Sequence, residues 1–450
     1  MAIIDTSTRG TLAPLVGRTL SLRDGRYPAT DTTFDYDVAI IGLGYVGLPT
    51  ALAYHAAGSR VLGIDVSAAR LDQIHAGAVD LITRDHERLG DALAQDSFEI
   101  TGDVSQLSRA EAVIVCVPTP VDHYLVPDLT MLRGACETVV ANAVAGQLLM
   151  LTSTTYVGCT AEMLLNPMTR KGLVPGRDIY IAFSAERIDP GQETVSQESV
   201  PRVVGGATEA CVERAAAVLG GYAADVHRVS SLGTAEMTKL LENTFRAVNI
   251  ALINEFADIC RTLDLNVTDV IDAAATKPYG YMPFTPGAGV GGHCIPCDPH
   301  YLLWQLRKER VEAPMIAEAM QQISNRPTQV VERIRQLLSD RGRSLAGSRI
   351  LVVGVAYKPD VADLRESPAL EIMQRLRAYG ASIGYVDPHV PRLVLDGREM
   401  EPVKHPATFA PTLVLLHTGH RAETLDWLRP DQLVLDATYR GTGIANRVVL

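Results

Sequence analysis

The segment from residue 37 to residue 65 constrains the fold of this chain more than any other part of the sequence. A short apolar run at 37–41 is followed by Gly42-Leu-Gly44-Tyr-Val-Gly47, a helical run to about Ala57 and a second apolar run at 60–65. In a strand-loop-helix-strand unit, these glycines permit a tight turn and let a pyrophosphate approach the N-terminus of the helix. The segment therefore predicts a βαβ unit that binds a dinucleotide. The alternative is that the glycines only make a tight turn.

Three residues outside the glycines refine this prediction. Asp65, at the end of the second strand, can accept from a ribose diol and would repel a 2′-phosphate, which favours NAD over NADP. Arg70 lies close enough in sequence to reach a phosphate, and the alternative is a solvated side chain. Thr119, in the segment 117–120, follows a predicted strand, where ligands bind in such sheets. The alternative is that the prolines beside it only end the strand.

The first half of the chain continues the same alternation. Apolar runs at 112–117, 148–152 and 179–182 are separated by helix-length segments, which predicts a parallel sheet covered on both faces. After Gly233 about thirty residues contain neither Pro nor Gly and place apolar residues at helical spacing, so we expect one long helix. More helix is expected on both sides of a Pro/Gly-rich loop at 278–299. We expect so apolar a middle region to form a subunit interface.

A second strand-loop-helix-strand unit follows. Its strands are expected at 349–353 and 382–387, with a helix at 367–379, and strand-like runs at 412–416 and 433–436 extend it. We therefore expect an α/β protein with two Rossmann-like doubly wound domains joined by a long helix and a helical middle domain. The predicted segments are an N-terminal arm (1–35), an NAD-binding domain (36–232), a helical connector and dimerisation domain (233–340) and a C-terminal Rossmann-like domain (341–450).

The charge balance and the cysteines exclude some classes of protein. A formal charge of −11 over 450 residues argues against a sequence-independent nucleic-acid binder, which neutralises phosphates with Lys and Arg. Seven cysteines, an odd number at irregular spacing, do not suggest a disulfide framework and favour a reducing compartment. No stretch approaches the ~20 apolar residues of a membrane span. We expect a cytoplasmic protein that binds neither nucleic acid nor membrane.

Three interpretations compete for the thiols, imidazoles and acid in residues 289–300. A metal site would use His293, Cys294, Cys297 and His300, but structural zinc sites usually join two ligand pairs from separated stretches. A Cys-x-x-Cys redox pair is expected in a thioredoxin-like βαβ context, and this motif follows a long helical segment. The third interpretation is a single nucleophile, Cys294, with Cys297 as a small buried residue, and it fits a bound NAD. No metal is expected.

The chemical reason is the oxidation of a primary alcohol. Removal of a hydride yields an aldehyde, and a second hydride leaves only after a nucleophile or water has added to the carbonyl. A thiolate adds readily, and the thiohemiacetal then loses hydride to form a thioester that hydrolyses to an acid. One nicotinamide site can therefore serve both oxidations.

Such a site also needs an oxyanion stabiliser and an acid or base. Lys239 and Asn243 are four residues apart on the predicted long helix, so both can point into one site and form an oxyanion clamp. The alternative is a solvated polar pair. Asp298 could hold Lys239 or a water, or only cap the helix suggested by Pro299. Glu186 could be an acid or base, or a charge on a surface loop.

The second βαβ unit lacks the three-glycine loop. The segment 354–367 stands in its place, is longer and carries Lys358 and Arg365. A basic loop at strand ends suits a diphosphate that is not a dinucleotide. The alternative is a set of charged residues exposed to solvent.

Several motifs together resemble the UDP-glucose/UDP-N-acetylhexosamine 6-dehydrogenase family, in the family's order. They are GLGYVGLP, VPTP, STT, ERIDPG, K-x3-N, GVGGHCIPCDP and AYKPDVADLRESPA, and the match runs from about residue 37 to 440. The resemblance implies four-electron oxidation of C6 of a UDP-sugar to the uronic acid. It also implies two NAD reduced per sugar, a Cys thiohemiacetal and thioester, and a homodimer that meets through its helical middle.

The resemblance also assigns roles to individual residues. The implied catalytic residues are Cys294 as nucleophile, Lys239 and Asn243 as oxyanion stabilisers, Asp298 with Lys239 and water in acid/base chemistry, and Glu186 and Thr154 around the catalytic water. The implied cofactor-binding residues are Gly42, Gly44, Tyr45, Val46, Gly47, Asp65, Arg70, Pro118, Thr119 and Thr154. The implied substrate-binding residues are Glu186, Arg187, Lys239, Asn243, Phe284, Gly291, Lys358 and Arg365.

The sequence departs from the family pattern near two of these residues. Ala185 stands where the family usually has Pro, and Val157 and Cys159 replace a common Pro and Thr. His293 and the segment 275–287 look like the branch that acts on UDP-N-acetylglucosamine, whereas UDP-glucose enzymes more often have Ser at the position of His293. UDP-glucose and UDP-N-acetylmannosamine are the alternative substrates.

Two other functions compete with this one. A two-electron β-hydroxyacid dehydrogenase of the 6-phosphogluconate type also joins a Rossmann domain to helices and a Lys/Asn site. It needs neither a thiol nor a second Rossmann-like domain. A non-catalytic NAD-sensing or metal-binding protein is the alternative from another class.

Overall fold

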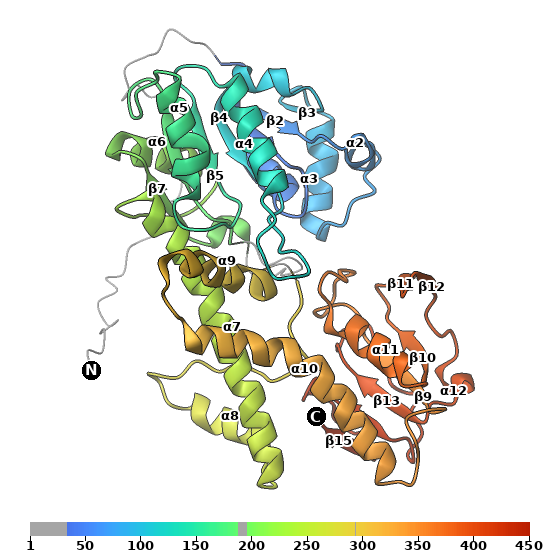
Figure 1. Cartoon of the computed structure of the whole chain (residues 1–450). Coiled ribbons are helices and arrows are strands. Elements are labelled where there is room, and N and C mark those ends of the chain that lie inside the picture. Colours follow the sequence, from blue (N-terminus) through green and yellow to red (C-terminus); the bar gives the residue numbers. More distant parts are fainter. Residues whose placement is uncertain (1–33, 188–195, 293) are drawn as a thin grey trace.

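The computed structural model describes residues 34–187, 196–292 and 294–450. Within them the chain forms two sheet-based units with a group of helices between them (Figure 1). The fold class predicted from the sequence is confirmed. The predicted N-terminal arm, apart from residues 34 and 35, lies outside the described residues. In the part of the chain that is described, no helix combines the length and apolar character that a membrane span needs.

The first unit is built on a sheet with the strand order β3-β2-β1-β4-β5-β6-β7-β8. β1 and β4 lie beside each other in the sheet and are largely buried, because helices cover it (Figure 1). The strands are β1 (Tyr36–Ile41), β2 (Val61–Ile64), β3 (Phe98–Thr101), β4 (Ala110–Val115), β5 (Leu148–Leu151), β6 (Tyr180–Phe183), β7 (Arg202–Gly206) and β8 (Val226–Arg228). The helices are α1 (Gly47–Ala56), α2 (Ala68–His75), α3 (Thr83–Leu93), α4 (Thr130–Asn142), α5 (Asn166–Arg170) and α6 (Glu209–Leu219), with short turns η1 (Val104–Arg109) and η2 (Ala161–Leu165).

One strand pair departs from the parallel sheet expected from the sequence. β6 and β7 run antiparallel, with Ala182 opposite Gly206 and Phe183 opposite Gly205. The connection runs over residues 184–201, and its described residues hold only the short 3₁₀ helix η3 (Gln197–Ser199) and not the α-helix that usually crosses over between parallel strands. The expectation of a wholly parallel sheet was therefore wrong at this step. As a consequence, the start of β7 lies at the same edge of the sheet as the end of β6.

The helices of the middle region are α7 (Leu232–Thr262), α8 (Val267–Ala275), α9 (Cys294–Glu309) and α10 (Pro314–Ser339). α7 is the long helix predicted after Gly233, and its 31 residues span about 46 Å at 1.5 Å per residue. The loop expected at 278–299 ends earlier, because α9 already begins at Cys294. Pro299 lies inside α9, so the alternative in which Asp298 only caps a helix was wrong.

The second unit is a parallel sheet with the order β10-β9-β13-β14-β15. β9, α11 and β10 are the second strand-loop-helix-strand unit expected from the sequence. The elements are β9 (Arg349–Val353), α11 (Pro368–Ala378), β10 (Ser382–Val386), α12 (Pro406–Phe409), β13 (Leu413–Leu416), β14 (Val434–Asp436) and β15 (Arg447–Val449), with an antiparallel hairpin of β11 (Leu393–Leu395) and β12 (Arg398–Met400). Strand order reverses between β9 and β13, which is where ligands bind in such sheets.

α7 links the two units through two separate cores. Its first half packs with the first sheet, and Leu232, Ala235 and Leu240 belong to that core. Its second half belongs to a core shared with α10 and the second sheet, to which Ile253 and Ala257 contribute. One continuous helix therefore positions both sheets.

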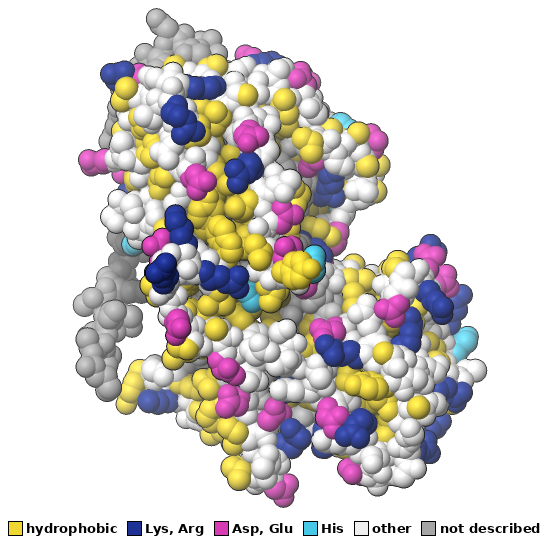
Figure 2. Space-filling view, in the orientation of Figure 1, with side chains coloured by type: hydrophobic (Ala, Val, Ile, Leu, Met, Phe, Trp, Pro, Cys, Tyr) yellow, Lys and Arg dark blue, Asp and Glu magenta, His cyan; other side chains and the backbone are white. Residues whose placement is uncertain are grey.

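The second half of α7, together with α8, exposes apolar side chains, which are visible at the lower left of Figure 2. We call this surface the α7–α8 apolar face. Its residues are Leu252, Phe256, Ile259, Leu263, Val270 and Met282, all of them exposed. Exposed apolar side chains that gather in one patch are typical of an interaction surface.

Gly354→Ala should lower the thermal stability of the protein. Gly354 follows β9 with φ +75°, and a Cβ there would overlap the backbone O of Thr418. A left-handed non-glycine residue already costs ~1–3 kcal/mol, and the overlap adds to this. We expect the melting temperature measured by circular dichroism to fall by roughly 3 °C or more.

Gly397→Ala is the matched control for this substitution. Gly397 has φ +71° but no heavy atom within 4 Å of a Cβ, so the variant carries the conformational cost alone. An equal fall in melting temperature for both variants would show that the contact with Thr418 is unimportant.

Candidate active site

The glycine loop after β1 has a shape that requires glycine at two positions. Gly42 has φ +86°, and a Cβ there would lie 2.8 Å from the backbone O of Cys116. A Cβ on Gly47 would overlap the backbone O of Gly42, because α1 starts directly against the loop. Gly44 instead faces open space, as close approach of a pyrophosphate requires. The loop therefore fits a dinucleotide.

Asp65 and Arg70 hold this loop from the second strand. The carboxylate of Asp65 accepts from the backbone N–H of Leu43 and from that of Ser67, each at 2.9 Å. Both oxygens keep a lone pair for a ribose diol. Arg70 Nε donates to the backbone O of Leu43 at 2.8 Å, so only its terminal Nη atoms can face a phosphate. Val46 ends the loop as the N-cap residue of α1.

The other residues predicted to bind the cofactor follow neighbouring strands. Pro118 and Thr119 come after β4 and Thr154 comes after β5. Pro118 is exposed and both threonines are half-buried. The backbone O of Thr119 accepts from the hydroxyl of Tyr301 in α9 at 3.2 Å. This bond ties the cofactor edge of the sheet to the helix that begins at Cys294.

Lys239, Asn243 and Asp298 form one buried cluster between α7 and α9. They are 8%, 3% and 3% exposed, so the alternative of a solvated Lys/Asn pair was wrong. Asn243 Nδ2 donates to Asp298 Oδ2. Lys239 Nζ donates to the backbone O of Glu186 at 2.9 Å and lies near enough to Asp298 to stabilise its negative charge. The structure therefore brings these predicted catalytic residues together.

Burial raises the pKa of Asp298 to about 6. The positive charge of Lys239 and the hydrogen bond from Asn243 oppose this rise, because both favour the carboxylate. A carboxyl whose pKa lies near neutral pH is suited to proton transfer. The site thus gives Asp298 the properties of a general acid or base.

Cys294 begins α9, one turn before Asp298. All seven cysteines lie in the described residues, and of these Cys294 alone is exposed. The thiol reaches solvent, yet protein surrounds much of it, and this partial desolvation together with the charge of Asp298 raises its pKa. Three nearby cations lower the pKa of the same thiol: Lys239, Arg246 and Arg365. Cys297 is buried, which raises its pKa to about 12, as expected of an inert thiol.

The described residues of the alternative metal site, Cys294, Cys297 and His300, do not form a group that could hold a metal ion. Among the described residues, no group of metal-ligating atoms includes Cys294, Cys297 or His300. Burial lowers the pKa of His300. His293, the remaining member of that set, lies outside the described residues.

Glu186 is held in the interior of the protein. Arg202 Nη1 donates to its Oε1, and the backbone N–H of Arg187 donates to the same oxygen at 2.6 Å. Arg202 opens β7 and is 1% exposed. Arg187 directs its own guanidinium to the backbone O of Pro201 at 2.7 Å and to the carboxylate of Glu242. The alternative of a surface-loop charge for Glu186 was therefore wrong.

The glycines before Cys294 let the second unit approach the start of α9. We call residues 354–367 the substrate loop. A Cβ on Gly291 would lie 2.5 Å from Cβ of Tyr357, and a Cβ on Gly292 would lie 3.0 Å from the Tyr357 ring. The backbone N–H of Gly292 donates to the backbone O of Arg365 at 2.9 Å. The substrate loop is therefore packed against the segment that leads to Cys294.

Arg365 lies between the two Rossmann-like units. Its Nε donates to both carboxylate oxygens of Asp363 at 2.9 Å, and its guanidinium lies 4.0 Å from the centre of the Tyr45 ring. Arg365 was predicted on the UDP-sugar side, but the structure places it against the glycine loop of the cofactor unit. Lys358 lies earlier in the substrate loop, with Nζ 5.9 Å from the centre of the Tyr357 ring.

Phe284 lies apart from the other predicted substrate-binding residues. It lines an apolar cavity of about 210 Å³ between α7 and α8, together with Phe256 and Ile271, and none of the other predicted site residues lines that cavity. Its ring centre is 6.0 Å from that of Phe245 on α7. This position favours a packing role over contact with substrate.

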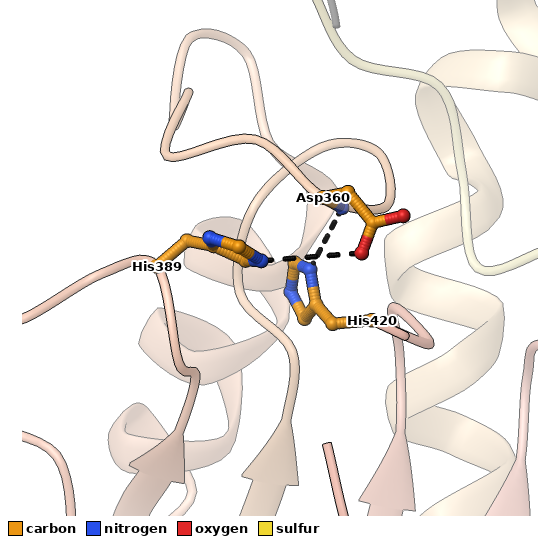
Figure 3. A group of neighbouring side chains, drawn as sticks. All are labelled: Asp360, His389 and His420. Carbon is orange, nitrogen blue, oxygen red and sulfur yellow. Dashed lines mark hydrogen bonds and ion pairs between the residues drawn. The ribbon is translucent and has the colours of Figure 1, made fainter. Parts of the chain in front are cut away.

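Asp360, His389 and His420 form a cluster at the edge of the second sheet (Figure 3). His420 Nδ1 accepts from the backbone N–H of Asp360 at 2.9 Å, and its Nε2 lies 3.0 Å from Asp387 Oδ2. Arg421 donates to both oxygens of Asp360, from its backbone N–H at 2.9 Å and from Nε at 2.6 Å. Because both ring nitrogens of His420 are already used, we interpret the cluster as a brace for the substrate loop and not as a metal site.

Sequence reasoning missed Arg202 and the pair formed by Asp387 and His420. One signal was available for Arg202, because a charged residue at the start of an apolar run (RVVGG) needs a buried partner. Asp387 follows the second strand of its unit as Asp65 follows that of the first, and it accepts from the backbone N–H of Val355 at 2.7 Å. No local pattern identifies the partner of either residue.

Comparisons with known proteins agree with this site. Three models of the UDP-glucose/GDP-mannose dehydrogenase family match consecutive parts of the chain: the NAD binding domain (residues 36–221), the central domain (residues 233–325) and the UDP binding domain (residues 351–437). These matches confirm the prediction of NAD as cofactor. They do not favour the β-hydroxyacid dehydrogenase or the non-catalytic NAD-sensing protein.

Individual relatives are similar over most of their length. The chain is 35% identical over 370 residues to a UDP-N-acetyl-D-mannosamine dehydrogenase of Campylobacter jejuni, covering 80% of this chain and 88% of that protein. It is 33% identical over 361 residues to a UDP-N-acetyl-D-glucosamine 6-dehydrogenase of Pseudomonas aeruginosa, covering 79% and 83%. A solved UDP-D-ManNAc dehydrogenase from Pyrococcus horikoshii matches with a TM-score of 0.83 at 29% identity, covering 92% of this chain and 98% of that one. The chain therefore belongs to the UDP-glucose/GDP-mannose dehydrogenase family of NAD-dependent UDP-sugar dehydrogenases.

Proposed function

We propose that this protein oxidises C6 of a UDP-N-acetylhexosamine to the uronic acid in two NAD-dependent steps, with UDP-N-acetylglucosamine as the first candidate substrate. The observation that carries the proposal is the position of Cys294. Its exposed thiol begins α9 beside the buried Lys239, Asn243 and Asp298. The substrate loop is packed against the glycines that precede it.

In the first oxidation, Asp298 takes the proton of the C6 alcohol. A carboxyl with a pKa of about 6 is ionised at neutral pH and can accept that proton directly or through a water. Bound NAD supplies the hydride acceptor for each oxidation. Lys239 stabilises the developing negative charge on the oxygen.

Cys294 then adds to the aldehyde carbon, which forms a C–S bond and an oxyanion. Lys239 uses one of its three N–H groups on the backbone O of Glu186, and Asn243 uses one of its two on Asp298. The remaining donors of both residues are free to face the oxyanion of the thiohemiacetal. These hydrogen bonds support the proposal that Lys239 and Asn243 act as an oxyanion clamp.

The second oxidation leaves a thioester on Cys294. Water adds to the thioester carbon, the C–S bond breaks, and the thiolate leaves as the acid forms. We place Glu186 and Thr154 around this water. Overall, one alcohol, one water and two NAD give one carboxylate, two NADH and three protons.

The substrate loop would hold the rest of the sugar nucleotide. Lys358 is suited to the diphosphate of UDP. Arg365 lies over Tyr45 of the glycine loop, so we propose that it also faces the dinucleotide. One loop would then contact both ligands.

The choice of sugar rests on the segment 275–287 and on the names of the relatives. That segment, with His293, resembles the UDP-N-acetylglucosamine branch, and His293 lies outside the described residues. UDP-N-acetylmannosamine is the second candidate, because two of the relatives described above carry that name. The unpaired cysteines support a reducing compartment, so we propose a cytoplasmic enzyme that supplies uronic acids to polysaccharide or glycoconjugate synthesis.

The purified protein should release two NADH for each UDP-sugar consumed. The assay follows absorbance at 340 nm with limiting UDP-N-acetylglucosamine, UDP-N-acetylmannosamine or UDP-glucose and excess NAD. UDP-N-acetylglucosamine should give the highest kcat/KM, and mass spectrometry should identify the uronic acid. One NADH per sugar with a free aldehyde as product would contradict the proposal.

Cys294→Ser serves as the control for the covalent step. The variant should still bind NAD and UDP-sugar, but kcat should fall by roughly 10²-fold or more, because a hydroxyl is a far weaker nucleophile than a thiolate. An unchanged kcat in this variant would remove the covalent mechanism.

The activity should fall as the pH drops through about 6. The folded pKa of Asp298 is raised to about 6, so below this pH the carboxyl is protonated and cannot accept the alcohol proton. Asn243→Ala removes a hydrogen bond that favours the carboxylate, so the acidic limb of its residual kcat should move to higher pH. The measurement is kcat at saturating substrates from about pH 5 to pH 9. An acidic limb at the same pH in both proteins would contradict the role of Asp298.

We further propose that the α7–α8 apolar face joins two copies of the chain. Phe256→Glu with Ile259→Glu places two charges on this face and should convert a dimer into monomers, as measured by light scattering after size exclusion. Val394→Glu, which adds a charge to an exposed apolar residue of β11, should leave the mass unchanged. A wild-type protein that is already monomeric would contradict this proposal.

A further inference from the structure

Arg202 and Lys239 contact the same residue, Glu186, at different atoms. Arg202 Nη1 donates to the carboxylate of Glu186, while Lys239 Nζ donates to its backbone O at 2.9 Å. Arg202 is 1% exposed, Lys239 is 8% exposed, and the side chain of Glu186 is 10% exposed. A buried carboxylate therefore lies near two buried cations, and Arg202 forms an ion pair with it.

The antiparallel step between β6 and β7 creates this arrangement. Glu186 follows the end of β6, and Arg202 opens β7 at the same edge of the sheet. The guanidinium also lies 5.3 Å from the centre of the Tyr222 ring, within the range of a cation–π interaction. Thr50 Oγ1 lies 3.5 Å from Glu186 Oε2 and in turn accepts from Gln197 Nε2 at 3.1 Å. The carboxylate is thus held toward β7.

We propose that Arg202 is a positioning residue for the oxidation: it neutralises the carboxylate of Glu186 and so prevents that carboxylate from capturing the ammonium of Lys239. The ammonium then stays directed at Cys294 and Asp298. The catalytic consequence of this contact rests on the proposed function. The effect of Arg202 on the position of Lys239 does not depend on which sugar is oxidised.

The physical reason is that a buried carboxylate requires a counter-charge. Without the charge of Arg202, Glu186 can regain a counter-charge by turning toward Lys239, whose Nζ already bonds to the backbone O of the same residue. Lys239 would then no longer act on the thiol of Cys294, whose pKa it lowers, or on Asp298, whose pKa it also lowers. Both pKa values should rise.

The other charged and titratable groups around the two reactive residues do not contact Glu186 among the described contacts. They are Cys297 and Tyr301 on α9, Arg246 on α7 and Arg365 on the substrate loop. Their effects should be the same in all variants compared. A change in the titration of Cys294 therefore reports on Lys239.

The test is the pH dependence of Cys294 alkylation by iodoacetamide in the full-length protein without substrate. Cys294 is the exposed cysteine, so mass spectrometry of its peptide gives the rate directly. In Arg202→Met, alkylation at neutral pH should be roughly tenfold slower, because its midpoint moves up by about one pH unit. Arg202→Gln, also uncharged, should behave in the same way, and Arg202→Lys should remain close to wild type.

The double variant Arg202→Met with Glu186→Gln distinguishes two causes of slower alkylation. One is capture of the Lys239 ammonium by the carboxylate of Glu186, and the other is disruption of the fold by the loss of Arg202. A neutral amide at 186 does not capture Lys239, so Cys294 alkylation should return to the wild-type profile. Arg214→Met is the matched control, because Arg214 also pairs with a glutamate, Glu111, and lies 5.9 Å from the centre of the Tyr180 ring. Its alkylation profile should not change.

Two results would overturn the inference. One is a wild-type alkylation profile in both Arg202→Met and Arg202→Gln, and the other is a double variant that stays as slow as Arg202→Met. In turnover with UDP-sugar, the acidic limb of kcat should also move to higher pH in Arg202→Met. A wild-type protein that releases no NADH from any UDP-sugar would overturn the proposed function alone, and the alkylation profiles would still decide the role of Arg202.

Discussion

The buried hydrogen bond between Asn243 of α7 and Asp298 of α9 is the interaction on which the site depends. A carboxylate that is 3% exposed needs a donor and a counter-charge, and Asn243 and Lys239 supply these from one face of a single helix. Because α9 begins at Cys294, fixing Asp298 against α7 also fixes the position of the proposed nucleophile. α7 packs on both sheets, so the cofactor unit and the substrate loop are positioned against the same helix.

The two Rossmann-like units share one local arrangement of a glycine and an acid, but the acid has a different environment in each. A glycine with positive φ opens each loop, Gly42 in the first unit and Gly354 in the second, and an acid after the second strand accepts backbone N–H groups from that loop. Asp65 is half-buried, so its carboxylate can still accept hydrogen bonds from a ribose. Asp387 is 5% exposed and is covered by His420. The acid of the second unit therefore braces the substrate loop and is closed to a nucleotide ribose.

The sequence by itself determined most of the helices and strands of this protein and indicated which side chains are candidates for its chemistry. The glycine loop from Gly42 to Gly47, the long helix after Gly233 and the thiol of Cys294 were all predicted, because turn, helix and motif signals lie within short stretches of chain. The common face of Lys239 and Asn243 also followed from sequence, since a spacing of four residues fixes it on any helix. One error was local: the start of α9 at Cys294 was missed because Pro and Gly residues surround it.

Only the tertiary structure decided which of these residues meet. The antiparallel turn of β7, the ion pair of Arg202 with Glu186 and the stacking of Arg365 on Tyr45 each join segments far apart in the chain. No local pattern specifies such a partner, because each contact arises from how whole elements pack. The raised pKa of Asp298 has the same origin, since its burial and its hydrogen bond come from a helix 55 residues earlier in the sequence.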